Sequence, residues 1–161
     1  MKLTDSQLVL FDEAVYEQKD PVAEIVRGTS EVISYSFSEH SADSAYVACR
    51  VRYNDPKKGL IQATYQAPSA PEDGPLLEIN EQVASIAEAQ RLAKKRLREK
   101  NKEAAKASIE LDGNVQMVTG VTILITGWKN FDGKYIITSA KHSISSGYQT
   151  SIEIRKVLEG Y

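Results

Sequence analysis

The sequence is poor in the residues that build covalent and metal-bound sites. Of its 161 residues, one is a cysteine and two are histidines. The single thiol, Cys49, cannot form an internal disulfide, so a small secreted fold held by disulfides is excluded. Cys49, His40 and His142 also show no HExxH or paired CxxC spacing. We therefore expect no metal, no cofactor and no catalytic residue.

Long hydrophobic runs and an excess of one charge are missing as well. The run Val121 to Ile125 is far shorter than the roughly 20 residues that a membrane-spanning helix needs. Residues 1–7 lack the apolar core of a secretory signal. With 20 basic and 22 acidic residues, the whole molecule has no electrostatic reason to bind nucleic acid or an anionic membrane. We expect a protein that is made in the cytoplasm and has no membrane partner.

Prolines are few, and three of the five fall between Ala67 and Pro75. Such a segment forms neither a helix nor a central strand. The sequence therefore predicts an exposed loop over 67–77 that joins two halves of one domain. We prefer this interpretation to a linker between independent domains, because neither half has enough strands and helix to enclose a core.

Alternating apolar and polar residues, typical of half-buried strands, run through most of the chain. The expected inward faces are Ile33, Tyr35 and Phe37; Ala45, Val47, Cys49, Val51 and Tyr53; Ile61, Ala63 and Tyr65; Val121, Ile123 and Ile125; and Tyr148, Thr150, Ile152, Ile154 and Lys156. A further strand is expected at 105–111. From 120 to 158 the pattern predicts three antiparallel strands in a row. Asp132-Gly133 and Ser146-Gly147 supply turn residues that tolerate positive φ.

The first 27 residues are less clearly patterned. Val22 to Val26 predicts an edge strand beside Pro21. We expect residues 1–27 to be a connecting segment from a preceding module, and 28–161 to form the main domain.

One long amphipathic helix is expected over 81–103. Its N-cap is either Asn80 or Ser85, the latter through the capping box Ser85-Ile-Ala-Glu88. Leu92 lies away from the predicted inner stripe, either as a lone exposed leucine or as a contact to another chain. The stripe itself consists of Val83, Ile86, Ala87, Gln90, Ala93, Leu97 and Ala104.

Basic residues cluster on the same helix: Arg91, Lys94, Lys95, Arg96, Arg98, Lys100 and Lys102. They are either a face that binds nucleic acid or phosphate, or a solvated flank paired with Glu88, Glu99 and Glu103. The absence of interleaved aromatic residues favours the solvated flank. Trp128 and Tyr148 mark either an interface or the core and its rim. The candidate interface residues are thus Leu92, Lys95, Arg96, Trp128 and Tyr148.

These patterns together predict an α+β, mainly β fold. We expect an antiparallel β-barrel of about seven strands with one long amphipathic helix across it.

Several segments in order also resemble a known family. They are Arg27-Gly28, the turn Tyr53 to Pro56, the basic helix Ala93 to Asn101, Gly127-Trp128, Gly133 to Ile137, His142 and Gly147 to Val157. This order is similar to the C-terminal part of the late control protein D family. Members of that family form the baseplate hub of contractile phage tails and are related in architecture to the VgrG spike of type VI secretion.

The resemblance implies a tube-type β-barrel domain of a non-enzymatic virion protein. Its partners would be the tail tube, the spike and further copies of itself, with a homotrimer in the full-length hub. It would be located in the baseplate of the phage or prophage tail, after assembly in the host cytoplasm. Two alternatives remain open, which are a VgrG-like spike component and a nucleic-acid-binding module that uses the basic helix 91–102.

Overall fold

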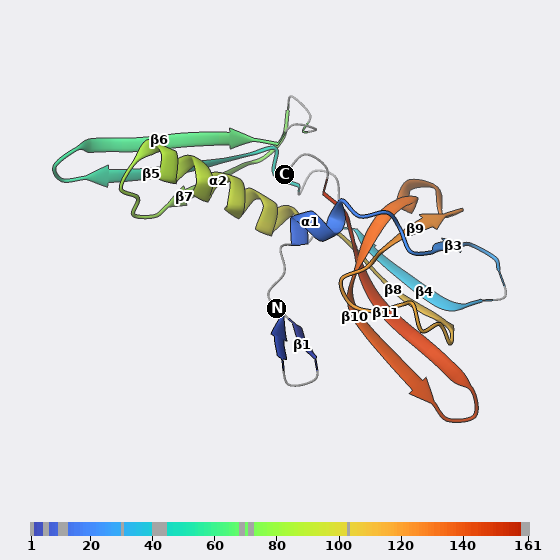
Figure 1. Ribbon diagram of the computed structural model, residues 1–161. Coiled ribbons are helices and arrows are strands. Elements are labelled where there is room, and N and C mark those ends of the chain that lie inside the picture. Colours follow the sequence, from blue (N-terminus) through green and yellow to red (C-terminus); the bar gives the residue numbers. More distant parts are fainter. Residues whose placement is uncertain are drawn as a thin grey trace. The chain divides into compact units, whose positions relative to one another are not determined.

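A computed structural model describes residues 2–4, 7–9, 13–29, 31–39, 45–67, 70, 73–102 and 104–158. The chain divides into two compact units. Unit 1 comprises residues 1–37 and 106–157, and unit 2 comprises residues 38–105 and 158–161. Figure 1 shows that strands predominate, as the sequence predicts, and that α2 is the longer of the two helices described.

Unit 1 is built on a six-stranded sheet whose order is β3-β9-β10-β11-β8-β4. The strands are β3 (Glu24–Val26), β4 (Val32–Glu39), β8 (Ala105–Asp112), β9 (Thr122–Thr126), β10 (Gly133–Ile144) and β11 (Tyr148–Lys156). The same unit holds β1 (Lys2–Thr4), β2 (Gln7–Val9), the short helix α1 (Glu13–Glu17) and the 3-10 turn η2 (Lys129–Phe131). β9, β10 and β11 pair antiparallel in sequence order, which confirms the three predicted C-terminal strands.

The N-terminal edge strand is also confirmed, although its pairing is parallel. β3 lies beside β9 with Glu24 opposite Leu124. β3 thus joins the sheet of unit 1, and the expected domain boundary after residue 27 stays a prediction.

The core of unit 1 consists of alternate residues of these strands. Ile123 and Ile125 are fully buried, as are Ile152 and Ile154. Thr122, on the opposite face of β9, is also buried because its hydroxyl donates to the carbonyl of Lys19 at 3.0 Å. β9 is therefore covered on both faces.

The six-stranded sheet curls toward a half-barrel. Trp128 follows β9 near one edge, yet its ring lies edge-on to Tyr35 of β4, at the other edge, with the ring centroids 5.4 Å apart. Ile33 and Tyr35, expected in the core, are 46% and 43% exposed. Their side chains are partly exposed because β4 is an edge strand, with a neighbouring strand on one side only. Phe37, on the same strand, does pack against the core.

The two C-terminal turns differ in their backbone. Gly133 adopts a φ of 139°, as expected, but Gly147 has no positive φ. The turn before β11 is closed instead by the Ser145 N–H, which donates to the Gly147 carbonyl at 3.0 Å. The turn that contains η2 is supported by the carboxylate of Asp132, which accepts from the Trp128 N–H at 2.7 Å.

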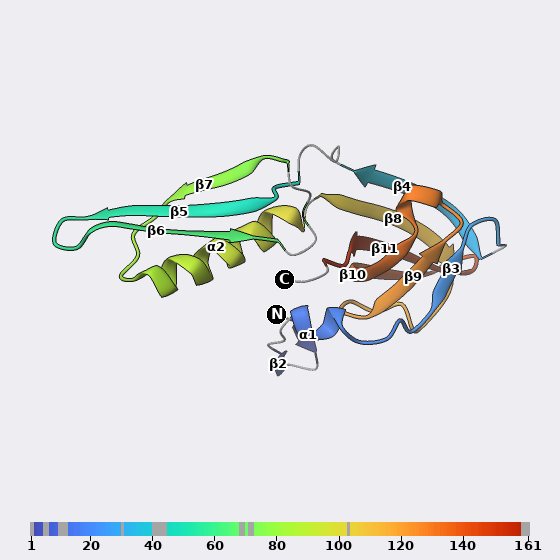
Figure 2. The same ribbon diagram turned by 90° about the horizontal axis from the view of Figure 1, so that it is seen from above.

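Unit 2 consists of a three-stranded sheet and helix α2 (Ile86–Asn101). The sheet order is β6-β5-β7, with strands β5 (Ala48–Asp55), β6 (Gly59–Gln66) and β7 (Leu76–Asn80). β5 and β6 form the predicted hairpin, and β7 runs parallel to β5. Figure 1 and Figure 2 show α2 lying along this sheet. Asp55 stabilises the hairpin turn by accepting from the N–H groups of Lys57 and Lys58, which lowers the pKa of its carboxyl.

The core of unit 2 lies between β5 and α2. Cys49, Val51 and Leu97 are each 0% exposed. This unit encloses its own core. The prediction that residues 28–161 form one barrel domain stays a prediction. Leu76 and Leu77, expected in the loop 67–77, belong to β7, whereas residues 68, 69, 71 and 72 lie outside the described residues.

The helix begins later than expected, at Ile86. The second of the two predicted caps is confirmed, because Ser85 Oγ accepts from the Glu88 N–H at 3.2 Å. The Asn80 cap is wrong, since Asn80 ends β7. Within the helix the fully covered positions are Ala89, Ala93, Leu97 and Asn101.

The predicted inner stripe is buried at Val83, Ala93 and Leu97, of which Val83 lies before the start of the helix. Ile86 is 63% exposed, and Ala87 and Gln90 are also exposed. Leu92, expected to point away, is half-buried against the core of unit 2. The buried line is set by alanines spaced four residues apart, which let the helix lie close to β5 and β6.

We expect Ser85→Ala to cost about 1 kcal/mol of unfolding free energy, because the Glu88 N–H loses its acceptor at the helix start. Thermal or urea denaturation measures this loss. Ser36→Ala, an exposed position on β4, serves as the matched control and is expected to change stability by less than about 0.5 kcal/mol. If Ser85→Ala and Ser36→Ala reduce the stability equally, Ser85 does not act as the helix cap.

Candidate assembly surfaces

The five candidate interface residues fall into two groups. Leu92, Lys95 and Arg96 lie on α2 in unit 2, whereas Trp128 and Tyr148 lie in unit 1.

On α2, Arg96 is engaged in ion pairs. Its guanidinium contacts Glu81 at 3.0 Å and Glu99 at 3.2 Å, and the hydrogen bonds to these two carboxylates raise the arginine pKa. Lys95 lies 3.9 Å from Glu99. Glu99 is thus an intrahelical partner, as the solvated-flank interpretation expects, whereas Glu88 accepts from the Ala84 N–H instead. Glu103 lies outside the described residues.

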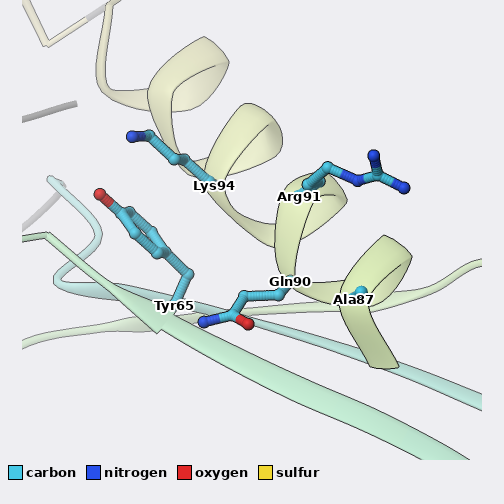
Figure 3. A pocket seen from close by; sticks show the side chains of 5 residues that line it. All are labelled: Tyr65, Ala87, Gln90, Arg91 and Lys94. Atoms are coloured by element: carbon cyan, nitrogen blue, oxygen red, sulfur yellow. The ribbon is translucent and has the colours of Figure 1, made fainter. Parts of the chain in front are cut away.

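The other flank of α2 borders a groove of about 420 Å³ above β6. Its lining residues are Tyr65, Ala87, Gln90, Arg91 and Lys94. Figure 3 shows Tyr65 reaching from β6 toward the helix, with the Lys94 ammonium 5.6 Å from the centre of its ring. Neither Arg91 nor Lys94 was placed among the candidate interface residues, because helical spacing alone does not reveal which flank overhangs a strand.

In unit 1, Trp128 lies in an aromatic cluster and is 6% exposed. Phe37 and Phe131 stack with their ring centroids 4.6 Å apart, and Phe37 lies 5.8 Å from Trp128. The surface-exposed member of the cluster is Tyr35, with the Arg27 guanidinium 5.8 Å from its ring centre. Trp128 thus supports the curl of the sheet from inside, and Tyr35 is the aromatic side chain that a partner can contact.

Tyr148 belongs to a hydrogen-bond network around His142. The ring Nε2 of His142 lies 3.1 Å from the Met117 carbonyl, which can only accept, so Nε2 carries the proton. The other nitrogen, Nδ1, then accepts from the Tyr148 hydroxyl at 2.9 Å and the Thr150 hydroxyl at 3.2 Å. Both ring nitrogens of His142 are thus used in hydrogen bonds within unit 1.

Thr150 connects this network to the next loop. It is 0% exposed, and its hydroxyl accepts from the Asn114 N–H at 3.0 Å. We expect Thr150→Val to cost about 1–3 kcal/mol, because the part-buried Asn114 N–H loses its acceptor and His142 loses a donor. Chemical denaturation measures the loss. Thr138→Val, on the exposed side of β10, is the control and should cost less than about 0.5 kcal/mol. If Thr150→Val leaves the stability unchanged, the hydrogen-bond network around His142 is contradicted.

Of the remaining residues considered for chemistry, Cys49 and His142 belong to different units. Cys49 is fully buried in unit 2, and this burial raises the pKa of its thiol and keeps it neutral. His142 belongs to unit 1, and His40 lies outside the described residues. Within the described part of the chain, no group of three or more His, Cys, Asp and Glu side chains could hold a metal ion.

A buried ion pair in unit 1 was not expected from the sequence. Arg155 on β11 is 4% exposed, and its Nη2 donates to Glu17 and, at 2.9 Å, to Glu13 of α1. Glu17 is also 4% exposed. Strand periodicity places Arg155 on the outer face of β11, and only tertiary structure shows that α1 covers it. This contact holds the N-terminal helix on the sheet.

Among the helices that the structure describes, none combines the length and the hydrophobicity that crossing a membrane requires.

No protein-family model and no curated protein sequence matches the chain. Several solved structures do. A tail protein from Neisseria meningitidis MC58 aligns with a TM-score of 0.63 at 16% identity, over 87% of this chain and 46% of that one. The 43 kDa tail protein of prophage MuSo2 from Shewanella oneidensis aligns with a TM-score of 0.68 at 14% identity, over the same shares.

A chain of the virion of a native gene transfer agent particle aligns less closely. Its TM-score is 0.52 at 14% identity, over 88% of this chain and 33% of that one. The chain thus spans about half the length of the two tail proteins. At these identities the likeness concerns the fold, and the chain shares its fold with these solved tail and virion proteins.

Proposed function

We propose that this chain is a structural, non-enzymatic part of a contractile phage or prophage tail. Within that tail it would belong to the baseplate hub that connects the tail tube to the central spike, as in the late control protein D family that the sequence resembles. The observation that carries the proposal is the shared fold with two tail proteins over 87% of the chain. The match to a virion chain supports the same class of assembly.

The described surfaces suit a protein that works by assembly. β3 and β4 end the sheet of unit 1, and β6 and β7 end that of unit 2, so each sheet offers edge backbone groups to a neighbour. Tyr35 adds an exposed aromatic side chain at one of these edges. Symmetric oligomers form through such repeated surfaces, and a homotrimer of the full-length hub is consistent with them.

The proposal is tested in particles. Tails are released by inducing the prophage that carries the gene, purified, and analysed by quantitative mass spectrometry. They should contain the protein in the stoichiometry of a trimer. Deleting its gene should stop tail assembly, and a plasmid copy should restore it. Particles that assemble normally without the protein would refute the structural role.

The same preparation separates the VgrG-like alternative. A tail protein copurifies with capsid, tube and sheath proteins in particles that contain DNA. A spike component of a secretion system would instead be found in the culture medium without capsid proteins, and its release would stop when the secretion genes are deleted.

A further inference from the structure

The groove between α2 and β6 exists because the helix is placed off-centre on its sheet. Ala89, Ala93 and Leu97 are buried, while Ala87 and Gln90 on the adjoining flank are exposed. That flank overhangs β6, and the half-buried ring of Tyr65 fills the space beneath it (Figure 3). This groove is open and largely apolar and lies at the edge of the sheet, and we call it the trough.

The charge around this trough has one sign. Of its five lining residues, two are basic and none is acidic. In Figure 3 the Lys94 side chain extends over Tyr65, whereas Arg91 points away from Tyr65. Among the described residues, neither Arg91 nor Lys94 lies in an ion pair, whereas Arg96 on the same helix has two carboxylate partners. The trough is therefore lined by two cations, of which Lys94 lies beside the aromatic ring of Tyr65.

The strand beneath the trough has a free edge. β6 ends the sheet order β6-β5-β7. The Ala67 N–H donates to the Val47 carbonyl at 3.0 Å, so Ala67 and every second residue before it direct their backbone groups toward β5. The alternate residues, which are Leu60, Gln62, Thr64 and Gln66, direct theirs outward.

An added strand would bring side chains into the trough. A residue paired opposite Tyr65 points to the same face of the sheet, and so do the residues two positions before and after it. That face is the one α2 covers. A central apolar side chain would then meet Tyr65 and Ala87, and its neighbours on that face would approach Lys94 and Arg91.

We propose that the trough and the β6 edge together bind an extended acidic segment of a partner protein. The segment pairs with β6 through main-chain hydrogen bonds and carries the pattern acidic, any residue, apolar, any residue, acidic. Main-chain pairing supplies affinity, and the charged and apolar positions supply specificity. The inference goes beyond the proposed function, because it concerns the chemistry of one surface and holds whichever assembly the chain joins.

The test uses the full chain labelled with 15N and a synthetic peptide, Ser-Thr-Glu-Thr-Leu-Thr-Glu-Thr-Ser, titrated to millimolar concentration. We expect saturable chemical-shift changes concentrated in β6 and in the first half of α2. The double variant Arg91→Glu/Lys94→Glu should weaken binding about 10-fold or more, which corresponds to about 1.4 kcal/mol. A peptide with lysine in place of both glutamates should not bind.

The matched control is Arg52→Glu/Lys100→Glu, which makes the same charge change at two exposed positions of unit 2 outside the trough. It should change the dissociation constant by less than about 2-fold, apart from long-range effects that salt screens. Circular dichroism and melting temperature show that both variants are folded. A peptide with N-methylated alternate amides, which cannot pair with a strand edge, should bind weakly.

Four results of the binding experiments would overturn the inference. They are the absence of saturable shifts at millimolar peptide, shifts located outside β6 and α2, equal weakening by the two double variants, and stronger shifts of the same residues by a single-stranded oligonucleotide. Concentration-dependent shifts of these residues without peptide would also overturn it, since the occupant would then be a second copy of the chain.

Discussion

Leu97→Asp is expected to unfold unit 2, with a loss of at least about 4 kcal/mol of stability. Leu97 is 0% exposed and lies between α2 and the sheet, in the core that includes Cys49 and Val51. Truncating a buried leucine alone costs about 2–5 kcal/mol, and an unpaired buried carboxylate adds to that cost. Thermal denaturation followed by circular dichroism measures the effect.

Ile86→Asp provides the control for this change. Ile86 begins the same helix but is 63% exposed, and an acidic residue in the first turn interacts favourably with the helix dipole. We expect a change of less than about 1 kcal/mol. A melting temperature that Leu97→Asp leaves unchanged would show that α2 does not cover the sheet of unit 2.

The second large effect is expected for Arg155→Met, which should cost about 3–5 kcal/mol. The change removes the guanidinium that offsets the buried negative charge of Glu17, which is 4% exposed. Because Glu17 lies on α1, we also expect this helix to detach from β11. Hydrogen exchange of the α1 amides measures detachment, and urea denaturation measures the loss of stability.

Two further variants test the cause. Glu13→Gln removes the outer carboxylate, which is 42% exposed, and should cost less than about 1 kcal/mol. The double variant Arg155→Met/Glu17→Leu removes both buried charges and should recover most of the stability lost by Arg155→Met alone. If the double variant is no more stable than the single one, the buried charge is not the reason for the loss.

Much of the strand structure was predictable, because the alternation of apolar and polar residues along a strand indicates which of its faces is buried. The inward faces of β5, β6 and β11 agree with the burial of Cys49, Val51, Ile61, Ile152 and Ile154. The order of β9, β10 and β11 followed from short turns, which leave antiparallel pairing as the simple outcome.

The local sequence pattern does not show which helix or strand packs over a given face. The alternation at Ile33 and Tyr35 is that of a half-buried strand, but their exposure depends on β4 being an edge. The burial of Arg155 depends on α1, which is more than a hundred residues away in the chain. The separate core of unit 2 likewise depends on β7, whose few residues follow a proline-rich segment and carry a weak strand pattern.

The candidate surfaces show the same limit. Helical spacing identified the basic residues of α2, and the structure shows Arg96 paired with Glu81 and Glu99. The flank that borders a groove, with Arg91 and Lys94, is distinguished only by the position of Tyr65 beneath it. The prediction that Lys95, Arg96, Leu92, Trp128 and Tyr148 meet partners stays a prediction.

The strand order of unit 1 has a consequence for synthesis on the ribosome. Its outermost strands, β3 and β4, are made first, whereas the four strands between them all come after residue 104. Unit 2 lies almost entirely between β4 and β8 in the chain. It can therefore fold before the strands that pair with β3 and β4 have been synthesised. Nascent chains should therefore acquire structure from the middle outward, and a truncation before β9 would leave β3 with no strand to join.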